Sequence, residues 1–206
     1  MKITIVGKAN GWKDAPYEGI VWGIHSHCLE RPFTMVWDMH KIDGTDIERG
    51  CSLGWHREII EHINKNKIPY MTLKKHDNIP TSIEFPIDEM ELKYSESSVS
   101  YMIWYAYHMG ATEIELYGVN MSNTDEYEEQ LKSTDYWIGY ARGKGIKVTV
   151  NEPTSVCKGM RGLYGYDFVN PSYMGTMYQA EDRYVLDARI QNDIDIQAQK
   201  RSNAQM

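Results

Sequence analysis

The segment SSVSYMIWYAYHMGATEIELYGVN, from Ser97 to Asn120, indicates the fold class of this chain. Two serines precede a run whose apolar residues have helical spacing, and after a glycine the strand-like run Glu113–Tyr117 ends in Gly-Val-Asn. A helix that leads into a buried strand is typical of a parallel sheet. Ligands of such sheets collect beyond the carboxyl ends of the strands, so the serine loop and the Gly-Val-Asn are expected to form two walls of a pocket.

Short apolar runs alternate with longer helical patterns over residues 1–150. This alternation predicts an α/β fold that is Rossmann-like, with a mostly parallel sheet and helices on both faces. The expected strands are Ile3–Val6, Ile20–Ile24, Thr34–Trp37, Pro69–Leu73, Glu113–Tyr117 and Lys147–Val150, and the expected helices are Gly54–Asn66, Val99–Met109 and Glu126–Gly143.

The character of the chain changes after Val150, which divides it into a Rossmann-like nucleotide-binding domain (1–150) and an appendage (151–206). Residues 151–170 are rich in Gly, Tyr and polar residues and are expected to form a cover loop. From Gln179 to about Lys200 a polar helical pattern predicts a C-terminal helical arm. That helix is too polar to lie deep in a core, so it either packs against another subunit of a homo-oligomer or is a frayed tail.

Composition excludes several classes of function. The 206 residues carry a net charge of −7 and no run of Lys and Arg, which argues against a nucleic-acid polymer as partner. The three cysteines are scattered and no CxxC occurs, so neither a zinc site nor a disulfide framework is indicated. No charged and apolar leader opens the chain, and no apolar run approaches the ~20 residues of a membrane span. We therefore expect a soluble, cytoplasmic protein with no membrane partner.

The first predicted strand is followed by a turn that contains Gly7, Lys8, Ala9 and Asn10. A glycine turn lets the backbone approach a phosphate, and Lys8 offers a counter-charge. The turn matches neither GxGxxG nor the Walker pattern. It therefore indicates either a nucleotide contact or a plain exit from a buried strand.

The second and third predicted strands end in titratable residues, with His25 after the second and Asp38 and His40 after the third. Alternation places Asp38 and His40 on the same side if the strand continues, and a carboxylate beside an imidazole suits a general base. His25 is expected to contact the ligand. Histidines and an aspartate can also hold a metal ion, but no HxxxH or HExxH helix supports one, so no metal is predicted. The plainer alternative is that these side chains only complete strand ends.

The serine loop has two interpretations, which are compatible. Ser97 or Ser98 is expected to cap the following helix, and the same helix end is a good site for an anion. Neither serine lies in a GxSxG elbow, so a hydrolase nucleophile is not expected. Gly118 and Asn120 close the next strand and are expected to face the same ligand.

Acidic residues open the last predicted helix, among them Glu126 and Glu129 on one face. Either carboxylate is a candidate base or an acceptor for sugar hydroxyl groups. An acidic first turn also simply complements the helix dipole.

The order of these signals resembles the Rossmann-like single-domain bacterial sialyltransferases and the related motility-accessory, pterin-pyrophosphokinase-like proteins, and is similar to small proteins of tailed phages. The resemblance covers residues 1–150. It implies that Gly7 to Asn10, Ser97, Ser98, Gly118 and Asn120 hold a nucleotide sugar. Those sialyltransferases take their base, a histidine, from between the strand that ends in Gly-Ile-Asp and the last helix. This chain has no histidine there and reads Tyr-Glu-Glu-Gln at 127–130.

The expected function is therefore binding of a nucleotide or nucleotide sugar, with a glycosyltransferase-like transfer as the leading activity. Its base would be Glu126, Glu129 or the Asp38–His40 pair, and no cofactor beyond the nucleotide ligand is predicted. The alternative is a non-catalytic phage protein that binds or sequesters a nucleotide-derived signal in the host cytoplasm. A purely structural role in assembly is a third possibility, suggested only by the polar arm.

Overall fold

A computed structural model describes residues 1–40, 53–121 and 125–158, without the side chains of 53–56 and 125–126. Met1–Cys157 form one compact unit. The predicted C-terminal arm and the cover loop beyond residue 158 lie outside the described residues. No helix in the described ranges has the length and apolar character needed to cross a membrane.

The described residues form seven strands, three α-helices and short 3-10 turns. The strands are β1 (Lys2–Val6), β2 (Ile20–Ile24), β3 (Met35–Asp38), β4 (Tyr70–Thr72), β5 (Ser82–Glu84), β6 (Glu113–Tyr117) and β7 (Lys147–Val150). The helices are α1 (Leu53–Asn66), α2 (Ser98–His108) and α3 (Asp125–Gly143), and the 3-10 turns are η1 (Trp12–Asp14), η2 (His25–His27) and η4 (Ile87–Glu89).

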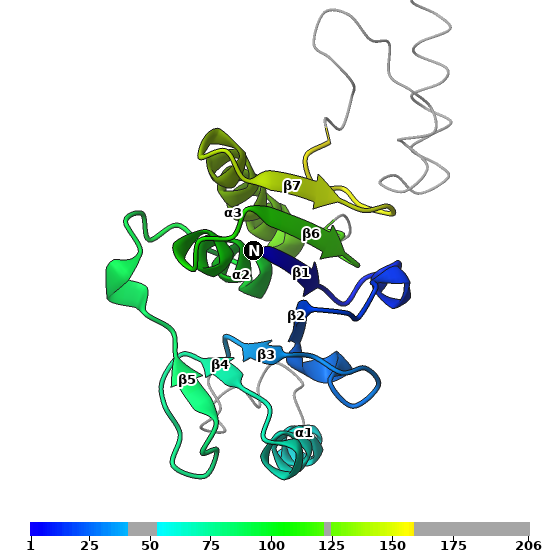
Figure 1. Ribbon diagram of the computed structural model, residues 1–206, viewed down its shortest axis with the longest axis vertical. Coiled ribbons are helices and arrows are strands. Elements are labelled where there is room, and N and C mark those ends of the chain that lie inside the picture. Colours follow the sequence, from blue (N-terminus) through cyan, green and yellow to red (C-terminus); the bar gives the residue numbers. More distant parts are fainter. Residues whose placement is uncertain (41–52, 122–124, 159–206) are drawn as a thin grey trace, which may run out of the picture. The chain divides into compact units, whose positions relative to one another are not determined.

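The strands build one sheet in the order β5-β4-β3-β2-β1-β6-β7, and every neighbouring pair is parallel. The chain moves outward from β1 to β5 and then returns to the other side of β1 with β6 and β7 (Figure 1). The connection after β1 thus leads toward one edge of the sheet and the connection after β6 toward the other. Parallel sheets bind their ligands in the crevice that opens between the carboxyl ends of two such strands.

Successive residues of a strand point to opposite faces of the sheet, so the strands contribute side chains to two separate hydrophobic cores, one on each face. On one face Ile3, Ile5 and Trp37 pack with α2 and α3, which lie together in Figure 1. On the other face Val21 and Val36 pack with the buried side of α1. The α/β class, the parallel sheet and the helices on both faces are therefore confirmed.

The strand β5 is the one sheet strand that the sequence did not predict. It has three residues at the sheet edge, and only Ser82 among them is buried. So short a strand has no apolar run and no clear alternation to reveal it. Both ends of each predicted strand and helix otherwise agree with the structure to within one residue.

Candidate functional site

A pocket of about 480 Å³ opens at the carboxyl edge of the sheet, where β1 and β6 diverge. Its walls are the turn after β1 (7–9), the end of β6 (118–121), and the loop with the first turn of α2 (95–99). His40, beyond the end of β3, also lines the pocket. The two walls expected from the sequence therefore lie at one pocket.

The turn after β1 touches the end of β6 through backbone alone. The Gly7 N–H donates to the Tyr117 carbonyl and the Ala9 N–H to the Gly118 carbonyl, each at 2.8 Å. Gly118 has φ +60°, and a Cβ there would lie 2.7 Å from the Ala9 carbonyl oxygen. These two amides are used inside the protein, so Gly7 and Ala9 shape the pocket but do not offer it those N–H groups.

The charged residues at this wall have opposite signs. Lys8 and Glu96 both line the pocket and are exposed, so the wall holds one cation and one anion. Asn10, which the sequence grouped with this turn, is exposed and lies outside the lining.

The two serines before α2 have different roles. The Ser97 hydroxyl accepts from the Ser100 N–H at 3.0 Å, and the Ser100 hydroxyl accepts from the Ser97 N–H at 3.2 Å, which is a capping box. Ser97 is 7% exposed, whereas Ser98 is more accessible and its hydroxyl has no hydrogen-bond partner among the described residues. Ser97 therefore holds the helix end, and Ser98 offers its hydroxyl to the pocket.

Buried hydroxyl groups fix this loop against α3, an arrangement that the sequence did not predict. Ser97 Oγ lies 3.0 Å from Thr134 Oγ1, and the Glu96 N–H donates to Ser133 Oγ at 3.1 Å. Ser133 and Thr134 are fully buried. The one sign of this contact in the sequence was a pair of small polar residues within α3. Sequence spacing cannot show that their partners lie at the start of α2.

Asn120 follows β6 and lines the pocket. Its side-chain oxygen is buried and has no hydrogen-bond partner within the part of the chain that the structure describes. A buried acceptor without a donor costs free energy, so a ligand that donates a hydrogen bond here gains affinity.

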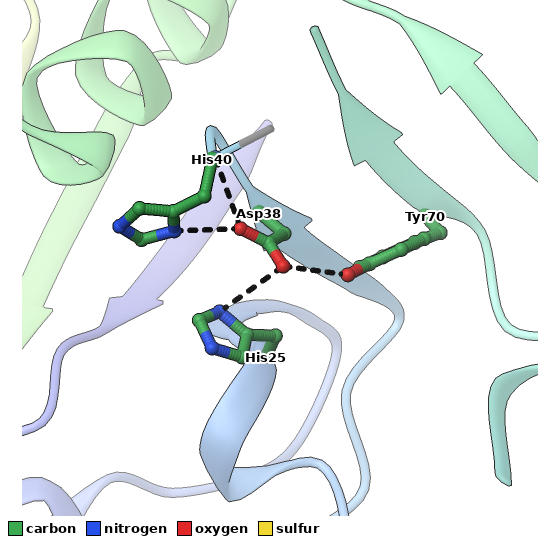
Figure 2. Close-up of polar contacts among 4 residues, drawn as sticks. All are labelled: His25, Asp38, His40 and Tyr70. Carbon is green, nitrogen blue, oxygen red and sulfur yellow. Dashed lines mark hydrogen bonds and ion pairs between the residues drawn. The ribbon is translucent and has the colours of Figure 1, made fainter. Parts of the chain in front are cut away.

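His25, Asp38 and His40 meet because β2 and β3 are neighbours in register. Gly23 pairs with Val36 and Ile24 with Trp37, so the next step along each strand brings His25 beside Asp38. Figure 2 shows the carboxylate between the two imidazole rings, with the Tyr70 hydroxyl approaching from β4.

The carboxylate of Asp38 is completely buried and accepts several hydrogen bonds. Its Oδ1 accepts from His40 twice, from Nδ1 at 2.7 Å and from the backbone N–H at 3.0 Å. Its Oδ2 accepts from the Tyr70 hydroxyl at 2.8 Å and lies 3.7 Å from His25 Nδ1. Asp38 is thereby held rigidly between β2, β3 and β4.

These contacts determine where the protons lie. Burial raises the pKa of Asp38, but the hydrogen bond from His40 and the nearby imidazoles lower it by more, to about 2. Burial and the charge of Asp38 raise the pKa of Tyr70. Asp38 is therefore an anion at neutral pH and can only accept, so His40 Nδ1 carries the proton and donates it to Asp38.

The other nitrogen of His40 is thus an acceptor in the neutral ring. Figure 2 shows Nε2 on the side of the ring away from Asp38. The His40 side chain is 41% exposed, while Asp38 and His25 are buried behind it. The predicted pair is therefore assembled, with Nε2 on the side of the ring away from Asp38 (Figure 2) and the supporting carboxylate protected from water.

The acidic residues of α3 are placed less favourably. Glu129 is exposed, forms an ion pair with Lys132 at 2.6 Å, and lies outside the pocket lining. The side chain of Glu126 is outside the described residues. Among the described side chains of α3, those of Tyr127 and Gln130 line the pocket.

His25, Asp38 and His40 also form a set of possible metal ligands, with one ligand atom from each lying within 4.8 Å of the others. No helical metal motif marks these ligands in the sequence, because they come from the ends of two adjacent strands.

No protein-family profile matches this chain, and searches for similar curated proteins and for similar solved structures found none.

Proposed function

We propose that this protein binds a nucleotide-linked donor, such as a nucleotide sugar, and transfers the donor group to an acceptor hydroxyl. The observation that carries the proposal is that His40, oriented by Asp38, lines the same pocket as the N-terminus of α2. A base and an anion site at one pocket are what a transfer with a phosphate leaving group requires.

The N-terminus of α2 is the proposed phosphate site. Ser98 and Val99 line the pocket, and N–H groups in a first helical turn have no acceptor within the helix. Such a helix end favours an anion through these donors and through its dipole. The Ser98 hydroxyl and the charge of Lys8 add to this attraction.

The remainder of a nucleotide would occupy the wall near β6. There the Asn120 oxygen accepts a hydrogen bond from a ribose hydroxyl or a base amino group. A volume of about 480 Å³ is within the range of small-molecule sites.

In the proposed reaction, His40 Nε2 takes the proton of the acceptor hydroxyl while the oxygen of that hydroxyl forms a bond to the transferred carbon. The bond from that carbon to the phosphate oxygen breaks, and the nucleotide leaves with the electron pair. The helix N-terminus stabilises the new charge, while Asp38 stabilises the imidazolium. Product release and transfer of the proton to solvent restore His40.

The test is a thermal-shift panel of nucleotides and nucleotide sugars, followed by chromatography of the stabilising donor with acceptor sugars or with water. A donor at 100 times its dissociation constant adds ~2.7 kcal/mol of stability. His40→Asn should lower turnover by about 10²–10⁴ and retain donor binding. The matched control is His108→Asn. His108 also lies beside a carboxylate, that of Glu89, but it is not part of the pocket lining.

The outcomes separate the alternatives. Binding without transfer or hydrolysis supports the non-catalytic reading, in which the pocket sequesters a nucleotide-derived signal. Turnover that persists in His40→Asn removes His40 as the base. A panel in which no nucleotide stabilises the chain contradicts the proposal as a whole.

A further inference from the structure

We propose that His25, Asp38 and His40 form a binding site for one divalent transition-metal ion of the Zn²⁺ type, and that this ion competes with the proton on His40 Nδ1. The existence of the site follows from its own geometry. The effect on catalysis rests on the proposed function, and the two are tested separately.

The donor set selects the class of ion. Two imidazole nitrogens and one carboxylate suit Zn²⁺, Co²⁺, Ni²⁺ or Fe²⁺, whereas Mg²⁺ and Ca²⁺ prefer oxygen ligands throughout. One ligand atom from each residue lies within 4.8 Å of the others. An ion ~2.0–2.2 Å from its ligands in tetrahedral geometry holds them about 3.3–3.6 Å apart. His25 Nδ1 and Asp38 Oδ2, at 3.7 Å, are already near that separation.

The carboxylate of Asp38, between the two imidazole rings, is held in place by hydrogen bonds, as carboxylate ligands of metal ions are. The Tyr70 hydroxyl donates to Asp38 Oδ2, and the His40 backbone N–H donates to Oδ1. Hydrogen bonds of this kind orient the ligands of metal sites. Asp38 and His25 are 0% and 1% exposed, so these two ligands are fixed.

His40 is the ligand that must adjust. Its Nδ1 lies 2.7 Å from Asp38 Oδ1, too close for an ion to bridge the two atoms without movement. The residue lies two positions beyond the end of β3, and its side chain is 41% exposed, so its ring is less confined than that of His25. Because His25 and Asp38 are buried, the remaining coordination position lies on the side of His40, which lines the pocket.

Binding of the ion changes the tautomer of His40. The single proton of the neutral ring moves from Nδ1 to Nε2 by exchange with solvent, with no net release, as the metal–nitrogen bond forms, and Asp38 changes its partner from N–H to metal. The neutral ring then carries its proton on Nε2, so it faces the pocket as a donor. An ion-loaded His40 therefore cannot take the proton of an acceptor hydroxyl.

The binding experiment uses the full, untagged chain after treatment with a chelator. Co²⁺ is titrated and followed by visible absorption, and Zn²⁺ and Mg²⁺ are titrated by calorimetry. We expect one equivalent of Co²⁺ or Zn²⁺ to bind and Mg²⁺ not to bind. His40→Asn should weaken binding at least about tenfold, and His108→Asn, which removes a histidine beside a carboxylate outside the pocket lining, should leave it within twofold.

A second measurement uses the wild-type chain alone, so it does not depend on whether a variant folds. Paramagnetic Co²⁺ should shift or broaden the ring signals of His25 and His40 in an NMR spectrum of the wild-type chain, and leave those of His62 and His108 sharp. Absence of saturable binding, equal binding of Mg²⁺, full binding by His40→Asn, or broadening of all histidines alike would each overturn the site.

The catalytic effect is measured with the donor and acceptor of the transfer assay. One equivalent of Zn²⁺ should lower the rate at least about tenfold, and a chelator should restore it, because Nε2 loses its acceptor lone pair. A rate that Zn²⁺ raises or leaves unchanged contradicts the competition. If no transfer is found with metal-free protein, the proposed function fails while the binding data still decide the metal site.

Discussion

Neither Gly7 nor Gly118 has space for a Cβ, because the backbone after β1 rests on the backbone after β6. A Cβ on Gly7 would collide with the Gly118 carbonyl oxygen, and one on Gly118 would lie 2.6 Å from Trp12 Cβ. Both glycines line the pocket, so this backbone contact forms part of its wall.

Gly118→Ala should therefore destabilise the protein by about 2–4 kcal/mol, from the positive φ together with the clash against backbone. The control is Gly110→Ala, which has φ +73° but open space around its Cβ and should cost only about 1 kcal/mol. Urea denaturation of both variants measures the difference. Equal losses would show that the close approach contributes nothing.

The neighbouring serines 97 and 98 are expected to respond differently to the same substitution. Ser97→Ala removes a helix cap and should cost about 1 kcal/mol in the free energy of unfolding. Ser98→Ala should change stability by less than about 0.5 kcal/mol but weaken binding of a phosphate-bearing ligand. Chemical denaturation and calorimetry check the pair, and a reversal of the two effects would exclude this assignment.

Acid should remove the stability that Asp38 contributes. The pKa of Asp38 is about 2 in the folded chain and ~3.9 in an unfolded one, so its contribution is complete above pH ~4. It is lost as the pH falls from about 4 to 2, and amounts to about 2–3 kcal/mol. In metal-free protein, Asp38→Asn should be less stable at pH 7 and lose less stability over that interval. Glu129→Gln, at an exposed carboxylate, should retain the wild-type profile.

Tyr70→Phe tests the outer support of the same carboxylate. Loss of the hydroxyl leaves Asp38 Oδ2 without that donor, so the variant should lose roughly 1–3 kcal/mol at pH 7. The pKa of Asp38 should rise, because a hydrogen bond to its charged form is gone, and acid destabilisation should begin at higher pH. Unfolding curves at several pH values measure both effects. A wild-type acid profile would mean that Tyr70 does not support the carboxylate.

The fold was predictable because its strands and helices have clear periodicity and end at glycine or polar residues. The meeting of His25 and Asp38 was within reach of the sequence, since both follow apolar strands that point to one edge. Their distance required the register of β2 against β3. The contact with Tyr70 required the further fact that β4 lies beside β3, and strand order is not encoded locally.

The candidate site was predicted in part for similar reasons. Ser98, Gly118 and Asn120 line the pocket because parallel strands share an edge. Asn10 and Glu129 lie outside the lining, although each is directly next to a lining residue in the sequence. Whether a side chain faces the pocket depends, for Asn10, on the path of the turn and, for Glu129, on its position around the helix axis. Sequence spacing gives both only approximately.

Nucleotide binding at the edge between β1 and β6 can be seen in a crystal structure of the protein grown with the nucleotide that stabilises it most. We expect phosphate density at the amides of Ser98 and Val99, a hydrogen bond from the ligand to the Asn120 oxygen, and the reacting carbon on the side of His40. Ligand density at another surface, with the edge between β1 and β6 filled only by water, would exclude this pocket as the nucleotide site.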